Sequence, residues 1–181
     1  MGFDEEIGIG ELTFKKFISR EAIHDRMEQM AERINRDLAG SEVDILVLLD
    51  GAEAFANAIL PKFNFSNRVH YRQVKTYQGT ESTGRLELDT SWIGPFFDRE
   101  VLILEDIIDT GHTLYRVCEM LRLIGNIRYR IATLLLKPKQ LQYPVEPDYT
   151  GFEIGPDFVI GFGMDYNEQG RDLPDIYRLK S

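Results

Sequence analysis

Three short apolar runs restrict the fold more than any other feature of the sequence. They cover residues 43–49, 101–104 and 131–136, and each one ends at a polar turn. Short apolar runs bounded by turns are typical of strands that are buried on both faces. Segments with helical spacing of apolar residues follow the first two runs. This order of strand, turn and helix predicts an α/β fold with a mostly parallel central sheet flanked by helices.

The remaining segments extend this prediction along the chain. Apolar residues at helical spacing predict a helix over about 20–38, with Ser19 as its N-cap. Residues 68–77 predict a strand that leads into a polar loop over 78–85. The tail from Phe152 onward is rich in glycine and aromatic residues, and we expect it to cap one edge of the sheet.

Charge and cysteine content restrict the classes of partner. The formal net charge of -9 disfavours a nucleic-acid partner, because binding to a polyanion needs a basic face. A small anion can still bind in an amide-rich pocket. No apolar stretch approaches the roughly 20 residues that a membrane span requires, so we expect no membrane partner. The single cysteine, Cys118, cannot form an internal disulfide and favours a reducing, cytoplasmic location.

The stretch VLILEDIIDTGHTL, residues 101–114, holds the most specific chemical signal. Glu105 and Asp106 follow the apolar run, at the edge where a parallel sheet binds ligands. Taken alone, the stretch has a plain interpretation as a solvated turn in which Asp109 caps the next helix. A second interpretation uses the residues after Asp109. A glycine, two threonine hydroxyls and the free amides of a helix N-terminus together form a cradle for a phosphate.

The cradle differs from a P-loop because it lacks the lysine and the longer glycine spacing, so hydrolysis of nucleoside triphosphates is disfavoured. A phosphate cradle beside carboxylates suits a phosphorylated sugar. The carboxylates could accept hydrogen bonds from adjacent ribose hydroxyls, or balance a cation such as Mg²⁺. Both possibilities place the chemistry on the sugar.

At this point a family resemblance can be stated. The stretch LILEDIIDTGHTL resembles the phosphoribosyl pyrophosphate signature of the type I phosphoribosyltransferases. Four further stretches resemble the hypoxanthine-guanine branch of this family: LLDG (48–51), VKTYQGTESTG (74–84), LLLKP (134–138) and DYTGFEIGPDFVIGFGMDYNEQGRDLP (148–174). They occur in the family's order. The last two are the base-binding stretches, and they make the purine assignment specific.

The resemblance implies the type I phosphoribosyltransferase fold, as a single domain over residues 1–181. Its core would span about 20–150, and a small hood would form from the N-terminal segment and about 151–181. The implied activity is that of a pentosyltransferase of purine salvage with Mg²⁺ as cofactor. It would transfer 5-phosphoribosyl from phosphoribosyl pyrophosphate to a 6-oxopurine base, hypoxanthine or guanine. The products would be pyrophosphate and a purine nucleoside monophosphate, IMP or GMP.

The signature itself carries the ribose and phosphate contacts by this resemblance. Glu105 and Asp106 match residues that engage the ribose hydroxyls and the metal, and Asp109 matches the acid/base near N7 of the purine. The 5′-phosphate is assigned to the loop Asp109, Thr110, Gly111, His112 and Thr113. The chemistry agrees, because carboxylates stabilise the positive charge of an oxocarbenium-like centre. Relatives often carry lysine or asparagine in place of His112, whose amide can still bind phosphate.

Purine contacts are implied for Lys137, Phe158 and Val159. The counterpart of Lys137 donates to the 6-oxo group, and an ammonium suits a carbonyl acceptor better than an amino group. Phe158 would stack on the base, and Val159 would address its edge through the backbone. Without the resemblance, Lys137 could equally be a solvated lysine at the end of a strand, and Phe158 a core residue.

Pyrophosphate contacts are implied for Asp50, Gly51 and Arg171, and a metal contact for Asp165. Many relatives carry a basic residue in place of Asp50, and a carboxylate close to a phosphate would be repelled. We therefore expect the Asp50 side chain to point away while the backbone binds. Thr76 and Tyr77 match a lid that would exclude water from the reaction.

Two other functions are possible for a sequence of this kind besides that of a 6-oxopurine phosphoribosyltransferase. The same fold occurs in regulators that sense nucleotides and contact nucleic acid, although the acidic charge and the retained Asp109 and Lys137 argue against that role. A sugar-phosphate enzyme without purine specificity is the third reading. The sequence does not choose between hypoxanthine, guanine and xanthine, nor between a homodimer and a homotetramer.

Overall fold

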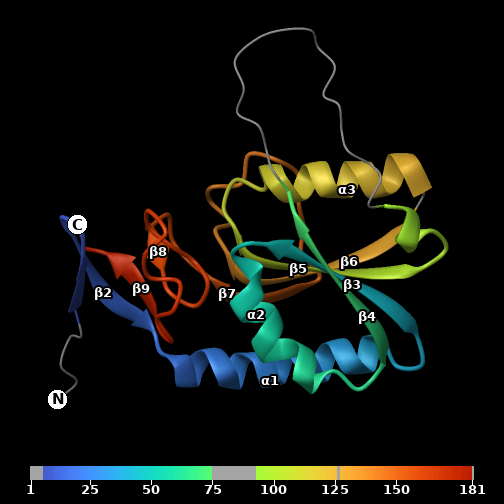
Figure 1. The fold of residues 1–181 in the computed structure, drawn as a ribbon, viewed down its shortest axis with the longest axis horizontal. Coiled ribbons are helices and arrows are strands. Elements are labelled where there is room, and N and C mark those ends of the chain that lie inside the picture. The colour runs from blue at the N-terminus through green and yellow to red at the C-terminus, as the bar shows by residue number, and fades with distance from the viewer. Residues whose placement is uncertain (1–5, 75–92, 126, 181) are drawn as a thin grey trace, which may run out of the picture.

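The structure is a computed structural model that describes residues 6–74, 93–125 and 127–180. Its larger part is a five-stranded sheet in the order β4-β3-β5-β6-β7, and every neighbouring pair is parallel. The strands are β3 (Glu42–Leu49), β4 (Ser66–Gln73), β5 (Glu100–Ile108), β6 (Arg128–Leu136) and β7 (Tyr149–Glu153). The predicted α/β class with a parallel central sheet is confirmed (Figure 1).

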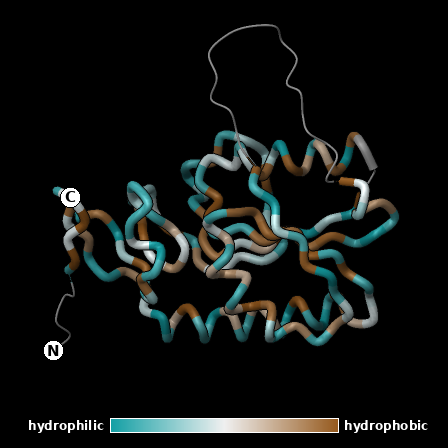
Figure 2. The backbone as a smooth tube through the Cα atoms, in the orientation of Figure 1, coloured by the Kyte–Doolittle hydropathy of each residue, from teal (hydrophilic) through white to brown (hydrophobic). Residues whose placement is uncertain are grey.

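Helices cover both faces of this sheet (Figure 1). Helices α1 (Arg20–Asp37) and α2 (Ala52–Ile59) pack on one face, and α3 (His112–Gly125) packs on the other. The Ser19 hydroxyl accepts a hydrogen bond from the Ala22 amide at 3.2 Å, so the predicted N-cap is confirmed. The tube of α1 alternates between hydrophobic and hydrophilic residues in Figure 2, as expected of a helix with one buried face.

Strand β5 is longer than the apolar run that predicted it. The run ends at Leu104, but pairing with β6 continues through Glu105 opposite Thr133 and Ile108 opposite Leu136. Two isoleucines after the acids supply further apolar residues, so the ladder does not stop at the first polar position. Glu105 and Asp106 therefore lie within the strand, which corrects the prediction that they follow its end.

A second, smaller sheet joins the two ends of the chain. It has the order β1-β2-β9-β8 and antiparallel pairing throughout. Its strands are β1 (Glu6–Ile9), β2 (Leu12–Ile18), β8 (Val159–Ile160) and β9 (Ile176–Leu179). This sheet is the hood expected from the terminal segments. The core sheet itself reaches Glu153, because β7 pairs with β6.

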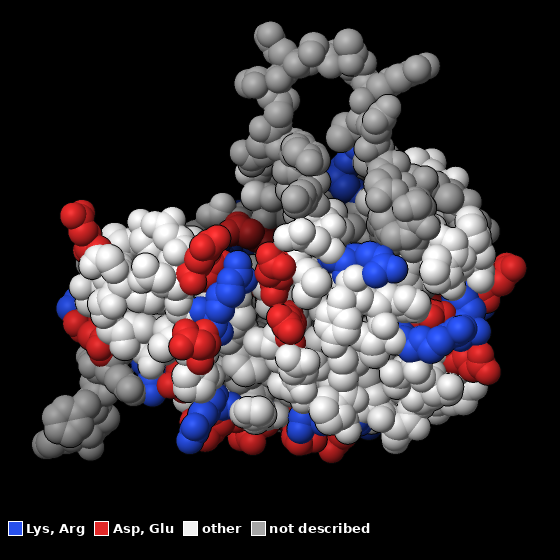
Figure 3. Space-filling view, viewed as in Figure 1, with Lys and Arg blue, Asp and Glu red and all other residues white. Residues whose placement is uncertain are grey.

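The hood meets the core at the turn between β3 and α2. A side chain built on Gly163 would overlap the carbonyl oxygen of Gly51 and lie 3.1 Å from the Ala54 side chain. Two short 3-10 helices, η1 (Leu60–Lys62) and η2 (Gly94–Phe96), complete the described elements. Lysine and arginine side chains lie beside acidic ones on the face shown in Figure 3, rather than in one basic surface. Within the described residues, no helix has the length and apolar character to cross a membrane.

Candidate active site

A cavity of about 280 Å³ lies where the carboxyl ends of the core strands face the hood. It is lined by Gly51, Asp106, Ile107, Asp109, Lys137, Phe158, Val159, Met164, Asp165 and Arg171. These residues come from the end of β5, from the loops after β3, β5 and β6, and from the hood. The carboxyl edge of a parallel sheet is where such sheets bind ligands. Eight of these ten residues had been assigned from the sequence to the purine, ribose, pyrophosphate or metal. The fold thus brings together side chains that lie up to 120 positions apart, from Gly51 to Arg171.

A smaller cavity of about 100 Å³ adjoins the first. Its lining is Glu105, Ile107, Ile108, Asp109, Thr110, Gly111, Thr113 and Leu114. The cavity therefore lies at the loop predicted to form the phosphate cradle, at the N-terminus of α3. Ile107 and Asp109 line both cavities. Asp109 therefore lies at the junction between the cradle and the larger cavity.

The plain interpretation of the signature, with Asp109 as a helix cap, does not hold. Helix α3 begins at His112, and the His112 amide donates to the Thr110 hydroxyl at 3.3 Å. The Asp109 carboxylate is engaged elsewhere, because its Oδ2 accepts a hydrogen bond from the Lys137 ammonium at 2.7 Å. Asp109 is half exposed, whereas Lys137 is 5% exposed.

The turn after β3 requires a glycine because it approaches β5 closely. A Cβ built on Gly51 would overlap the Asp106 carboxylate. The absence of a side chain lets the Asp50–Gly51 backbone reach the cavity beside Asp106. The Asp50 carboxylate lies outside the lining of both cavities and accepts a hydrogen bond from the Gln73 amide at 3.3 Å.

The two adjacent acids of β5 lie in an environment that disfavours their charge. Burial raises the pKa of Glu105 well above its usual range, and the neighbouring Asp106 carboxylate raises it further. Burial also raises the pKa of Asp106, while hydrogen bonds with Glu105 and with backbone groups, and to a smaller extent the charge of Arg171, counteract that shift. Glu105 Oε2 is enclosed and has no hydrogen-bond partner among the described residues. Such a site gains from a ligand that brings donors or positive charge.

Arg171 is held in place by two contacts within the hood. Its Nη2 lies 2.8 Å from Asp165 Oδ1, and its Nη1 donates to the Gly163 carbonyl at 2.8 Å. The second carboxylate oxygen of Asp165 accepts a hydrogen bond from the Glu168 amide at 2.7 Å. Both oxygens of Asp165 are thus engaged, and its predicted metal contact stays a prediction.

The loop after β6 forms hydrogen bonds to the backbone of the phosphate cradle, and these contacts were not predicted from the sequence. The amides of Gln142 and Tyr143 donate to the Thr110 carbonyl at 3.0 and 3.2 Å. The Tyr143 ring stacks on the His112 ring at 4.8 Å, and the His112 side chain lies outside the cradle lining. Polar and apolar residues alternate in the loop after LLLKP, so the sequence carried no clear signal for these contacts. Ile107 and Met164, which also line the larger cavity, had no polar chemistry to mark them.

The predicted lid residues Thr76 and Tyr77 lie outside the described residues.

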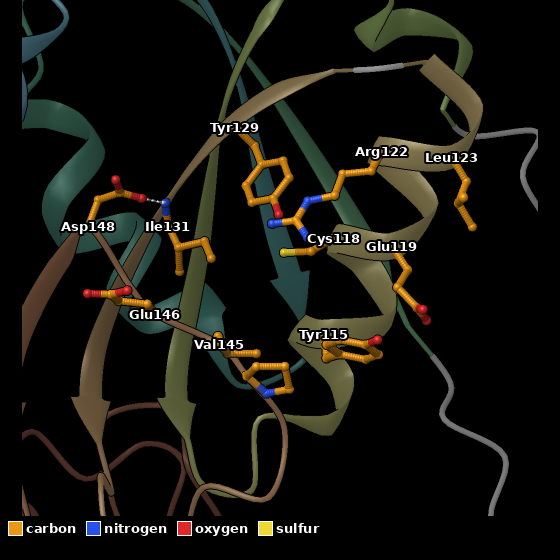
Figure 4. Close-up of a pocket in the computed structure, with 11 residues that line it drawn as sticks. Tyr115, Cys118, Glu119, Arg122, Leu123, Tyr129, Ile131, Val145, Glu146 and Asp148 are labelled. Atoms are coloured by element: carbon orange, nitrogen blue, oxygen red, sulfur yellow. Dashed lines mark hydrogen bonds between the residues drawn. The ribbon is translucent and has the colours of Figure 1, made fainter.

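A third cavity, of about 540 Å³, lies between α3, β6 and the loop before β7 (Figure 4). Its lining includes Tyr115, Cys118 and Arg122, and none of the predicted site residues. Burial raises the pKa of the Cys118 thiol, which therefore behaves as a small core residue, as predicted. The third cavity also has charged residues in its lining, but the acids and the lysine that were assigned from the sequence line the first two cavities, so these form the candidate active site.

Comparisons with known proteins identify the family. The profile of the phosphoribosyl transferase domain matches residues 19–167. The hypoxanthine-guanine phosphoribosyltransferase of Lactococcus lactis is 35% identical, over 92% of this chain and 91% of its own length. The hypoxanthine-guanine-xanthine phosphoribosyltransferase of Plasmodium falciparum is 33% identical, over 95% of this chain and 82% of its own length.

A solved structure gives the same result. The hypoxanthine phosphoribosyltransferase of Staphylococcus aureus superimposes with a TM-score of 0.79 at 31% identity, covering 91% of this chain and 90% of that one. Parallel sheet, hood and cradle together define a type I phosphoribosyltransferase. The chain belongs to the phosphoribosyltransferase family, and within it to the hypoxanthine-guanine branch that its sequence resembles.

Proposed function

We propose that the protein is a Mg²⁺-dependent enzyme of purine salvage. It transfers 5-phosphoribosyl from phosphoribosyl pyrophosphate to hypoxanthine or guanine, giving IMP or GMP and pyrophosphate. The observation that carries this proposal is the junction of two cavities at Asp109: one is a phosphate cradle, and the other has an aromatic ring and a buried ammonium. The relatives named for hypoxanthine, guanine and, in one case, xanthine support this substrate class.

The cavity of about 280 Å³ at the boundary between core and hood suits a 6-oxopurine. Phe158 is 43% exposed, so its ring is available for stacking on a base. Lys137 is a buried donor with no acceptor role, and it favours a 6-oxo group over a 6-amino group. Asp109, at the entrance to the cradle, accepts the proton that leaves the purine as the new bond forms at the sugar.

The cradle and the two adjacent acids of β5 suit the phosphoribosyl group. The backbone amides and hydroxyls of residues 110–113 would hold the 5′-phosphate, and the N-terminus of α3 favours its negative charge. Glu105 and Asp106 would accept hydrogen bonds from the ribose hydroxyls. Arg171 and the backbone of the 50–51 turn, both at the cavity wall, would bind pyrophosphate as it leaves.

Magnesium fits this arrangement when it arrives with its substrate. In the described part of the chain, no group of three or more His, Cys, Asp or Glu residues could hold a metal alone. Mg²⁺ usually binds through one or two carboxylates together with substrate phosphates and water. We propose that one or two of Glu105, Asp106 and Asp165 supply those carboxylates at a time, and the Glu105 Oε2, which has no partner among the described residues, supports a role for this residue. Bound Mg²⁺ would neutralise the departing pyrophosphate.

A spectrophotometric assay with hypoxanthine, guanine, xanthine and adenine tests the proposal. With phosphoribosyl pyrophosphate and Mg²⁺ present, we expect nucleotide formation from at least one 6-oxopurine and little or none from adenine. A folded protein that binds phosphoribosyl pyrophosphate but forms no product would instead be a binding module. Equal use of adenine would remove the proposed role of Lys137.

Location and assembly belong to the same proposal. We propose a cytoplasmic enzyme that forms a homodimer or homotetramer, without nucleic-acid or membrane partners. The free, buried Cys118 and the acidic net charge support the location and the partner class. Light scattering coupled to size-exclusion chromatography measures the oligomeric state.

A further inference from the structure

The ion pair between Lys137 and Asp109 links two groups to which the proposed reaction gives separate tasks. Lys137 directly follows β6, and its backbone amide donates to the Ile108 carbonyl at 2.9 Å. This bond fixes the lysine beside the end of β5, one residue from Asp109. The side chains then meet, with Nζ 2.7 Å from Asp109 Oδ2.

The two partners depend on each other unequally. The Lys137 side chain is 6% exposed and the Asp109 side chain 49%. Water can solvate the carboxylate without the lysine, but a buried ammonium without a counter-charge is strongly unfavourable. Asp109 is the only described carboxylate recorded within 4.0 Å of Nζ. The burial of Lys137 therefore maintains the pair and restricts Asp109 to one orientation.

This geometry leaves each group free to act on a ligand. An ammonium has three donors, so one bond to Asp109 leaves two for an acceptor on the base. A carboxylate has two oxygens, and Lys137 occupies Oδ2 only. Oδ1 remains available for a proton in the same cavity.

We propose that Lys137 is a positioning residue for Asp109, in addition to the contact with the purine 6-oxygen. The ammonium holds Asp109 by one oxygen and directs the other toward the purine proton. Binding of a 6-oxopurine and orientation of its proton acceptor then depend on one side chain. This inference rests on the proposed function, because it uses the proposed roles of both residues.

A double-mutant cycle with hypoxanthine tests the inference. The variants are Lys137→Met, Asp109→Asn and the double variant, with Lys139→Met as a matched control, since Lys139 is exposed and lines neither cavity. A lysine that only binds the base would act mainly on the KM for hypoxanthine. A lysine that also positions Asp109 lowers kcat, by about 10-fold or more for a displaced proton acceptor. Circular dichroism of each variant verifies folding.

The coupling between the two substitutions decides the outcome. We expect Lys137→Met to lower kcat in the wild-type background and to leave it nearly unchanged in the Asp109→Asn background. Fully multiplicative effects on kcat, or an effect of Lys137→Met on KM alone, would overturn the inference. Absence of IMP formation by the wild-type protein would instead contradict the proposed function.

A second measurement removes the 6-oxygen from the substrate. Unsubstituted purine carries hydrogen at position 6, so it offers Lys137 no acceptor there. In single-turnover reactions with this base, we expect Lys137→Met to react about 10-fold more slowly than wild type, because Asp109 is no longer held. Equal rates of the two proteins would show that the lysine acts only through the 6-oxygen.

Discussion

At the scale of single residues, the acids of the signature occupy three different environments. Asp109 is half exposed and paired with Lys137, Asp106 is buried, and Glu105 is partly buried with an enclosed Oε2 atom. Burial raises the pKa values of Glu105 and Asp106. Their spacing in the sequence revealed an acidic cluster beside a cradle, but it could not reveal this difference. The lysine that pairs with Asp109 lies 28 positions away, and burial depends on the whole fold.

The substitution Asp109→Asn tests whether Asp109, which lines both cavities, accepts the purine proton. An amide cannot accept the purine proton as a carboxylate does, so we expect kcat to fall by about 100-fold, in the range for loss of a general acid/base. The circular dichroism spectrum should still show a folded protein, with a lower free energy of unfolding because the buried Lys137 ammonium loses its counter-charge. Steady-state kinetics with hypoxanthine provide the measurement. Unchanged turnover would remove Asp109 from the mechanism.

The substitution Glu105→Gln tests the raised pKa of Glu105 through the free energy of unfolding. The folded protein holds the Glu105 proton more tightly than the unfolded chain does, because burial raises the folded pKa. The free energy of unfolding is therefore lost as pH rises from about 4.3, the unfolded value, through the raised folded pKa. Without Mg²⁺ or substrate at neutral pH, we expect Glu105→Gln to be more stable by about 0.5–2 kcal/mol and less active.

Urea unfolding in EDTA at pH 7 and at pH 4 measures this difference. The gain should shrink at pH 4, where both states carry the proton. Glu146→Gln, in an exposed loop, is the control and should change little. A Glu105→Gln variant less stable than wild type at pH 7 would show that the ionised carboxyl stabilises the fold.

At the scale of elements, the sequence predicted what local patterns determine. Helix α1 has its cap at Ser19, and the apolar runs became β3, β5 and β6. The extension of β5 to Ile108 depends on pairing with β6, and the pairing of the two terminal segments into one sheet depends on contacts far apart in the chain. The family resemblance, rather than periodicity, implied the hood. The support of the cradle by residues 142–143 was not foreseen, because loop contacts leave little pattern in sequence.

The turn between β3 and α2 can be tested with Gly51→Ala. The new methyl group would overlap the Asp106 carboxylate, so the turn or the acid must move. We expect a loss of about 1–3 kcal/mol in the free energy of unfolding, as for overpacking. The KM for phosphoribosyl pyrophosphate should also rise. Gly8→Ala is the control, because a methyl group there meets no atom within 4 Å.

The substitution Asp165→Ala tests whether Asp165 orients Arg171 in the hood loop. Arg171 loses the carboxylate at 2.8 Å that orients it. We expect the KM for pyrophosphate in the reverse reaction to rise by about 10-fold, the effect of about 1.4 kcal/mol of binding, with the KM for IMP unchanged. Asp172→Ala, beside Arg171 and exposed, is the control. An unchanged KM for pyrophosphate would show that Asp165 does not orient Arg171, and a higher Mg²⁺ requirement would support the proposed metal contact of Asp165.

At the scale of the whole molecule, the parallel sheet and the hood are both needed for the site. The core supplies Asp106, Asp109 and Lys137, and the hood supplies Phe158 and Arg171. The cradle lies entirely in the core. We therefore expect the phosphoribosyl group to bind to the core and the base to bind at the boundary between core and hood.

A crystal structure of the protein with IMP tests this assignment most directly. We predict the 5′-phosphate in the cradle at residues 110–113, the purine between Phe158 and Lys137, and the bond between base and ribose beside Asp109. IMP bound in the cavity between α3 and β6, or with its phosphate away from the cradle, would contradict the account.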